Sequence, residues 1–163
     1  DFEAQLAAGG QLHGALAALE TAWWYGEAAS SDKAARVATL SHLLFALLRV
    51  EEDADRDRLP LPMARMARYG LSRTDLRKDT PAREQALRAQ LGELAAAWRD
   101  AGQLPGPLSV FRALESDTGR ALARRAAKAT DPLATLRAGL SRSGFGTTWQ
   151  AWRAARQWQR QAG

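Results

Sequence analysis

The sequence predicts an all-α protein, a bundle of about six main helices. Apolar residues recur at steps of three and four along most of the chain, which is the spacing of one helix face. The strict alternation of apolar and polar residues that half-buried strands show occurs nowhere. Prolines and glycines fall between the apolar runs, where helices begin and end. Because 163 residues suit one domain, we expect a single all-α domain over residues 1–163.

Two apolar helices are expected in the first third of the chain. Residues 11–27 follow a break at Gly9 and Gly10, and their apolar residues share one face at steps of four, three and four: Leu12, Leu16, Leu19 and Trp23. The next helix begins near Ser30 or Ser31, either of which can cap it, and runs to about Glu52. Because this helix is apolar around much of its circumference, we expect it to lie at the centre of the bundle. The residues that make it apolar are Val37, Leu40, Leu43, Leu44, Leu47 and Leu48.

Proline and capping residues delimit the middle of the chain. Pro60 and Pro62 cannot lie inside a helix, so residues 53–62 are expected to form a loop. A short helix over 63–69 ends before Gly70, and Ser72 caps a further short turn through about Lys78. Pro81 after Thr80 starts a long helix through residue 101. The buried face of this long helix is expected to carry Leu87, Leu91, Leu94 and Trp98.

Three more helices are expected in the last third. The first spans about 108–128 and presents Val110, Phe111, Leu114 and Leu122. A short helix begins at Asp131 and Pro132 and runs through about Leu140. A joint at Ser143, Gly144 and Gly146 precedes the last helix, over about 146–161. That helix is basic and amphipathic, with Trp149, Trp152 and Trp158 beside Arg142, Arg153, Arg156 and Arg160.

Composition excludes several kinds of chemistry. The absence of cysteine excludes disulfides, thiolate metal sites, cysteine nucleophiles and iron–sulfur clusters, and two histidines are too few for a multi-histidine metal site. No apolar stretch reaches the roughly 18 residues of a membrane span. Arginine outnumbers lysine 20 to 3, which indicates a GC-rich genome. We expect a bacterial, cytoplasmic protein, with a peripheral position at the inner membrane face as the alternative; residue 1 is Asp, so what precedes it stays open.

Charge is divided unevenly along the chain. Residues 1–57 carry a net charge of −6 and residues 58–163 a net charge of +11. One interpretation is that the basic part meets an anionic partner, such as a membrane surface or a diphosphate. The other is that the two parts attract each other, or attract another subunit. The charge alone would suit nucleic acid, but no nucleic-acid-binding motif is recognisable, so we expect no nucleic-acid partner.

The densest polar chemistry is the acidic cluster EEDADRD, Glu51 to Asp57, at the end of the most apolar helix. Carboxylates at a helix C-terminus oppose the helix dipole, so the cluster is unfavourable unless something compensates it. Carboxylates beside an apolar groove are what a magnesium-dependent diphosphate enzyme needs, because oxygen ligands hold Mg²⁺ and the groove holds the hydrocarbon. The alternative is a solvated helix end that runs into a charged loop.

The run LLRVEEDADRDRLPLPMARMARYGL, residues 47–71, resembles the second aspartate-rich segment of the squalene/phytoene synthase family. In that family a helix ends in an aspartate motif, and arginines, a Leu-Pro step and a glycine follow. The resemblance extends weakly over most of the chain and implies an isoprenoid-synthase-like fold, with this chain similar to the C-terminal larger part. Members of the family condense two isoprenyl diphosphates head-to-head, with Mg²⁺ held between two aspartate-rich motifs on facing helices.

The Leu61-Pro62 step sets the register of this resemblance. It places Asp53 at the second aspartate of the family's D-x-x-x-D motif and Arg49 at the first. Positions 49 and 53 share a helix face, so we expect Arg49 to pair with Asp53 and to put a cation where the metal should bind. A second register uses Asp53 and Asp57, but it leaves four positions to Leu61 where the family has eight. The family's first aspartate-rich motif has no counterpart in the chain.

The other motif positions are altered as well. Leu48 falls at an arginine of the family, Phe45 at an asparagine and His42 at a glutamine, whereas Arg56 and Arg58 match the basic tail. The substrate-binding residues that the resemblance and the apolar pattern together indicate are Arg49, Arg56, Arg58, Leu44, Phe45, Leu47, Leu48 and Trp23. For His42 the residues alone leave two roles open, a hydrogen-bonded core histidine and a catalytic base.

We therefore expect a squalene/phytoene synthase-like protein without metal-dependent prenyltransferase activity and without a cofactor. It would bind a lipid-like, isoprenoid ligand or a protein partner. The alternative is an active, Mg²⁺-dependent head-to-head prenyltransferase whose first motif lies upstream of residue 1, with metal ligands among Glu51, Glu52, Asp53 and Asp57. A third hypothesis is a peripheral membrane or assembly factor that uses the basic last helix through Arg153, Arg156 and Arg160.

Overall fold

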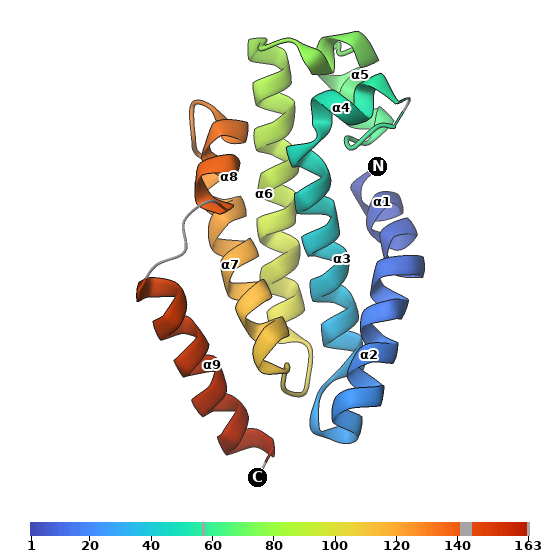
Figure 1. Cartoon of the computed structure of the whole chain (residues 1–163). Coiled ribbons are helices and arrows are strands. Elements are labelled where there is room, and N and C mark those ends of the chain that lie inside the picture. Colours follow the sequence, from blue (N-terminus) through green and yellow to red (C-terminus); the bar gives the residue numbers. More distant parts are fainter. Residues whose placement is uncertain (57, 141–144, 163) are drawn as a thin grey trace.

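The computed structural model of the chain describes residues 1–56, 58–140 and 145–162. Every regular element within them is helical, so the all-α prediction is confirmed. The long helices run side by side along the bundle, and the N-terminal helices and α9 lie at its opposite flanks (Figure 1). None of the described helices combines the length and the apolarity that crossing a membrane would require.

A nearly continuous helical rod opens the chain. It consists of α1 (Phe2–Gly9), the π-helical turn η1 (Gly10–Gly14) and α2 (Ala15–Tyr25), and the short 3₁₀ turn η2 (Gly26–Ala28) follows. The predicted break at Gly9 and Gly10 is wrong, because both keep helical φ values of −62° and −64°. Their missing side chains serve packing instead: a Cβ on Gly14 would lie 3.0 Å from Thr39 Oγ1 and one on Gly9 would lie 3.1 Å from Thr39 Cγ2.

The helix expected at the centre is there. Helix α3 (Ser31–Leu48) contacts α1, α2, α6, α7 and α8, and Ser30 caps it by accepting a 3.3 Å hydrogen bond from the Lys33 N–H. It ends four residues earlier than predicted, because the backbone of Arg49 (φ −105°, ψ 21°) leaves the helical conformation. The separate helix α4 (Val50–Asp55) then carries the acidic cluster away from the axis of α3.

The loop predicted over residues 53–62 is wrong for 53–55, which belong to α4, and the rest of the middle of the chain follows the prediction. Helix α5 (Met63–Arg68) ends before Gly70, whose φ of 62° suits glycine. Ser72 and Asp75 form a capping box around the 3₁₀ turn η3 (Arg73–Arg77). The long helix α6 (Pro81–Gln103) begins after Thr80, whose hydroxyl accepts the Arg83 N–H at 3.2 Å.

The last three described helices are α7 (Val110–Ala126), α8 (Pro132–Leu140) and α9 (Phe145–Ala162). Helix α7 packs against α6, and α8 and α9 pack against α7. Of the residues expected on the α7 face, Leu122 is buried and Phe111 is 62% exposed. Of the predicted joint, Ser143 and Gly144 lie outside the described residues, as does Arg142, and Gly146 lies within α9.

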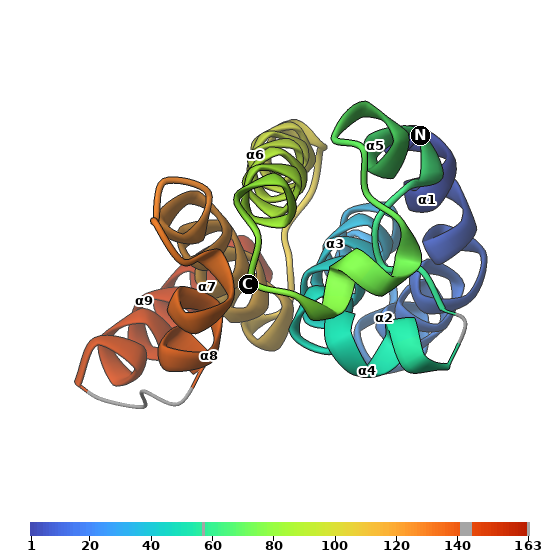
Figure 2. The ribbon, with the colours of Figure 1, turned by 90° about the horizontal axis from the view of Figure 1, so that it is seen from above.

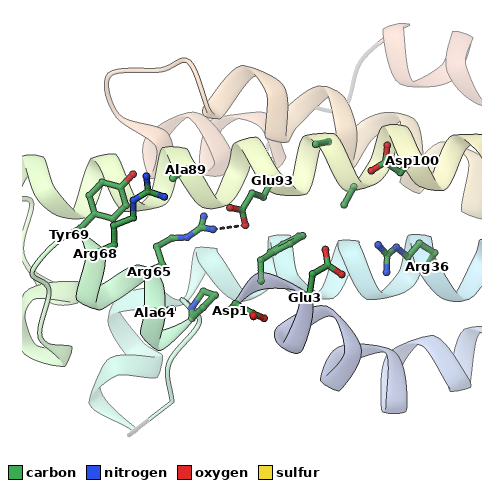
Figure 3. Close-up of a pocket in the computed structure, with 14 residues that line it drawn as sticks. Asp1, Glu3, Arg36, Ala64, Arg65, Arg68, Tyr69, Ala89, Glu93 and Asp100 are labelled. Carbon is green, nitrogen blue, oxygen red and sulfur yellow. Dashed lines mark ion pairs between the residues drawn. The ribbon is translucent and has the colours of Figure 1, made fainter.

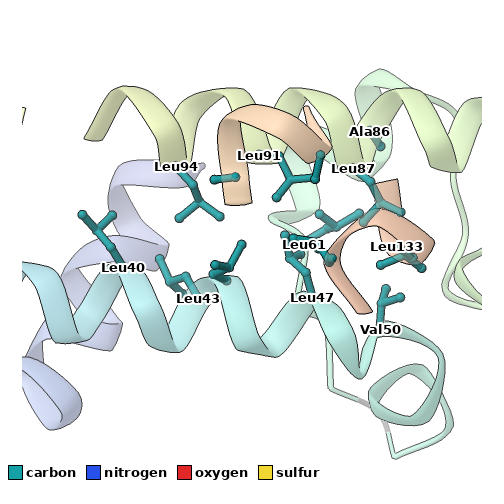
Figure 4. Close-up of a cluster of buried hydrophobic side chains, with 14 of the residues drawn as sticks. Leu40, Leu43, Leu47, Val50, Leu61, Ala86, Leu87, Leu91, Leu94 and Leu133 are labelled. Atoms are coloured by element: carbon teal, nitrogen blue, oxygen red, sulfur yellow. The ribbon is translucent and has the colours of Figure 1, made fainter. Parts of the chain in front are cut away.

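The main hydrophobic core lies between α3 and α6, and α4, α8 and the segment after α4 close its end (Figure 4). Seen from above, α1 and α2 flank α3 on one side, and α7, α8 and α9 extend the bundle on the other (Figure 2). The predicted α6 face is confirmed, because its four members are at most 1% exposed: Leu87, Leu91, Leu94 and Trp98.

Candidate functional site

Two of the five acidic residues in the cluster are paired with arginines. Glu51 forms ion pairs with Arg83 at 3.3 Å and Arg137 at 3.2 Å, and Asp55 pairs with Arg77 at 2.7 Å. These pairs join the acidic first part of the chain to the basic second part, and a further pair joins Glu20 to Arg112. The interpretation that the two parts attract each other is thus realised within one chain.

The predicted metal ligands do not form a common site in the described structure. Asp53 is only 6% exposed, whereas Glu52 points to solvent, and Asp57 lies outside the described residues. Within residues 1–56, 58–140 and 145–162, no three histidine or acidic side chains are grouped so that they could hold a metal ion. A cation at Glu51 would also have to compete with two guanidinium groups for the same carboxylate.

The expected Arg49–Asp53 ion pair is not among the ion pairs of the described residues. Arg49 is exposed and stands at the break between α3 and α4, while Asp53 is buried. Their contact is through the backbone, where the Asp53 N–H donates to the Arg49 carbonyl at 2.8 Å. The helix break is the physical reason, because Arg49 caps α4 and does not continue α3 as one face with Asp53.

The predicted substrate-binding residues separate into two groups. Leu44 and Leu47 are 2% and 0% exposed and belong to the core, and Leu48 packs against that core, so their predicted role in substrate binding stays a prediction. Arg49, Arg56 and Arg58 lie at the surface. Phe45 is 44% exposed, and Trp23, on α2, is 82% exposed. The reason is that α3 turns its leucines toward α6 and a different face, with His42 and Phe45, toward α2 and α7.

The face shared by the large apolar residues of η1 and α2 is turned to solvent. The four apolar residues at steps of four, three and four, which we name the α2 seam, are 58%, 56%, 66% and 82% exposed: Leu12, Leu16, Leu19 and Trp23. The face against α3 carries small residues, Gly14, Ala17 and Thr21. Close helix packing selects these small residues for the inside, which leaves the large apolar side chains outside.

A groove of about 330 Å³ lies between α2, α3 and α7. We call it the α2–α3–α7 groove; Leu16 of the α2 seam lines it together with Phe45. Arg112 of α7 spans it by pairing with Glu20 at 2.5 Å and with Glu115 at 2.7 Å. The buried hydroxyl of Ser41, which has no hydrogen-bond partner, belongs to the same lining.

The two histidines of the sequence meet in this groove. The rings of His13 and His42 stack at 3.5 Å between centroids with an interplanar angle of 18°. Burial lowers the pKa of His42, and nearby His13 and Arg49 lower the pKa of His42 further. Sequence reasoning missed this pair, because residues 29 positions apart come together only when η1 packs on α3.

The last helix presents aromatic rings and cations together. The rings of Trp149 and Trp152 stack at 4.7 Å, and Arg156 lies 5.2 Å above the Trp152 ring. Trp158 meets Tyr25 of α2 edge-to-face at 5.3 Å. Arg153, Arg156 and Arg160 are all exposed, so α9 is a packed terminal helix with a solvated basic face.

A larger cavity of about 530 Å³ lies between α1, α5 and α6 (Figure 3). An Arg65–Glu93 ion pair crosses it, and further charges of both signs line it, among them Glu3, Arg36 and Asp100. No described residue predicted as a site from the sequence contributes to this lining. Its mixed charge favours neither a cationic nor an anionic ligand.

Comparison with known proteins adds no relative: no protein-family model, curated protein or solved structure matches the chain. The resemblance to squalene/phytoene synthases therefore stays a prediction. The described residues group no set of metal ligands. What the geometry does assemble is an apolar surface beside a polar groove.

Proposed function

We propose that this protein acts by binding, as a helical interaction protein whose partner packs on the α2 seam and over the α2–α3–α7 groove. The observation that carries the proposal is the exposure of the whole seam, from 56% to 82% for its four members. Steps of four, three and four are the a/d spacing of a coiled-coil face, so the seam suits another helix. Contiguous apolar surface of this kind is characteristic of protein–protein interaction sites.

The proposal includes descent from a squalene/phytoene synthase-like ancestor that has lost metal-dependent catalysis. The all-helical fold is compatible with that origin. Further support comes from Arg49 at a motif aspartate position and from the arginines that neutralise Glu51 and Asp55. Binding of a lipid-like ligand in the groove is the weaker form of the proposal, because charged and imidazole groups line much of the groove.

A pair of variants tests the role of the seam. In samples dilute enough that the chain is monomeric, changing Leu16 and Leu19 to Ser removes apolar surface that is already in water, so the free energy of unfolding should change by no more than about 0.5 kcal/mol. Binding of a fluorescent dye that reports apolar surface should fall strongly. Gln85→Ser, at an exposed position on α6, is the matched control and should keep the dye signal.

Two outcomes would contradict the proposal. If the variant with Leu16 and Leu19 changed to Ser bound the dye like the parent protein, the seam would not be the accessible apolar surface. If it lost about 3 kcal/mol or more of stability, as core leucines do, the seam would be a structural face. The catalytic alternative has its own test: turnover of farnesyl or geranylgeranyl diphosphate to a head-to-head product with Mg²⁺ would replace this proposal.

A further inference from the structure

We infer that the partner of the α2 seam is a second copy of this chain, which places its α9 on the seam in a reciprocal dimer. This inference rests on the proposed function and names its partner. It starts from charge. The first 32 residues carry five acidic groups and no lysine or arginine, and Arg112 of α7 pairs with one of the five, Glu20, so Glu27 is the acidic group next to the seam residues in sequence that the charge argument uses. An anionic membrane would be repelled there, and a cationic helix would be attracted.

Helix α9 is a cationic helix with exposed aromatic rings. Residues 145–162 hold three arginines and no acidic residue. Trp149 and Trp152 remain 59% and 48% exposed although α9 packs on α7, so this chain covers neither these rings nor its own seam. One chain thus carries two complementary surfaces, the α2 seam and α9. In a two-fold dimer, each chain's seam contacts the other chain's α9, so the same contact forms twice.

The Tyr25–Trp158 contact sets the register. It fixes the C-terminal ends of α2 and α9 at one height in the bundle, and both helices run toward that end (Figure 1). Both also lie on the side of the bundle away from α6 (Figure 2). A two-fold axis along the bundle leaves height unchanged, so α9 of the second copy can lie parallel to α2 at the same level.

Counting back from that contact at about 1.5 Å per residue pairs the two helices residue by residue. Trp152 lies six residues before Trp158, as Leu19 lies six before Tyr25, and Trp149 and Leu16 both lie nine before. Arg153 falls at the level of Glu20, which Arg112 of α7 already pairs at 2.5 Å. Arg160 lies two residues beyond Trp158, and Glu27 lies two residues beyond Tyr25, in η2 and outside the helical count. Leu16 and Leu19 therefore meet tryptophans, and Trp23 falls at the level of Arg156.

A charge-exchange experiment tests this arrangement on the full chain. Glu27→Arg and Arg160→Glu each place like charges opposite one another at both contacts, so each variant alone should dimerise about tenfold or more weakly than the parent. An equimolar mixture of the two restores opposite charges at both contacts and should form a heterodimer. An ion pair within one chain could not produce that recovery. Sedimentation equilibrium of each variant and of the mixture measures the dimer dissociation constants.

A seam variant supplies an independent readout. Leu16→Glu should weaken dimerisation at least about 100-fold, because two copies of the leucine lose their burial. Gln85→Glu adds the same charge on exposed α6 and should leave the association unchanged. A mixture that associates no better than its components, or a parent chain that is monomeric at every concentration, would overturn the inference. Retained binding of the apolar dye to that monomer would leave the proposed function standing.

Discussion

Replacing Gly119 by alanine should destabilise the protein, although alanine is the better helix former. Gly119 lies in α7 against the ring of Trp98 from α6, and a Cβ there would be 2.5 Å from Cζ2, 2.9 Å from Cη2 and 3.2 Å from Cε2. Carbon atoms in contact prefer roughly 3.5–4.0 Å, so the ring or the helix must move by about 1 Å. Trp98 is 1% exposed and enclosed by the core, which leaves the ring little room.

The magnitude follows from two opposing contributions. Overpacking of this kind costs about 1–3 kcal/mol, and the backbone preference of alanine returns up to about 1 kcal/mol. A contact this short lies at the upper end of the overpacking range, so we expect a net loss of about 2 kcal/mol. For a chain of this size the loss corresponds to a melting temperature about 4–8 °C lower.

The matched control is Gly92→Ala in α6. A Cβ on Gly92 would have nothing within 4 Å, so only the backbone preference acts and the variant should gain about 0.5–1 kcal/mol. Urea unfolding of the two variants and the parent chain measures both changes. If Gly119→Ala were as stable as Gly92→Ala, the close packing of α7 on α6 would be refuted.

Further predictions concern charge. Since the pKa of His42 in the folded protein lies below its ordinary value of 6.5, the unfolded chain binds the proton first, and stability should fall as the pH drops below about 6.5. Urea unfolding at stepped pH measures this, and His42→Gln should flatten the profile. Arg83→Met should cost about 3 kcal/mol in thermal unfolding because it leaves the largely buried Glu84 carboxylate without its ion-pair partner, whereas Glu51→Gln should cost less, since Asp79 and Glu84 still pair with Arg83. If the basic face of α9 binds anionic vesicles, binding should weaken with salt and on neutralising its three arginines; salt-independent binding would reject the membrane hypothesis.

Sequence determined most of the secondary structure, because its signals are local. The caps at Ser30, Ser72 and Thr80, and Gly70 with its positive φ, act within a few residues of their position in the sequence. Periodicity likewise identified α3 as central, since a helix apolar around most of its circumference needs neighbours on several sides. The uneven charge of the two parts of the chain was also readable, and part of it is used in ion pairs between them.

Tertiary structure decided which apolar residues are inside. Periodicity showed that Leu12, Leu16, Leu19 and Trp23 share a face, but only the packing of Gly14 against Thr39 turns that face outward. Packing likewise decides that Leu44 and Leu47 lie in the core while Phe45 lies near the surface. Hydrophobicity is not directional, so a pattern in the sequence specifies a surface to be covered and leaves open whether the same chain or another one covers it.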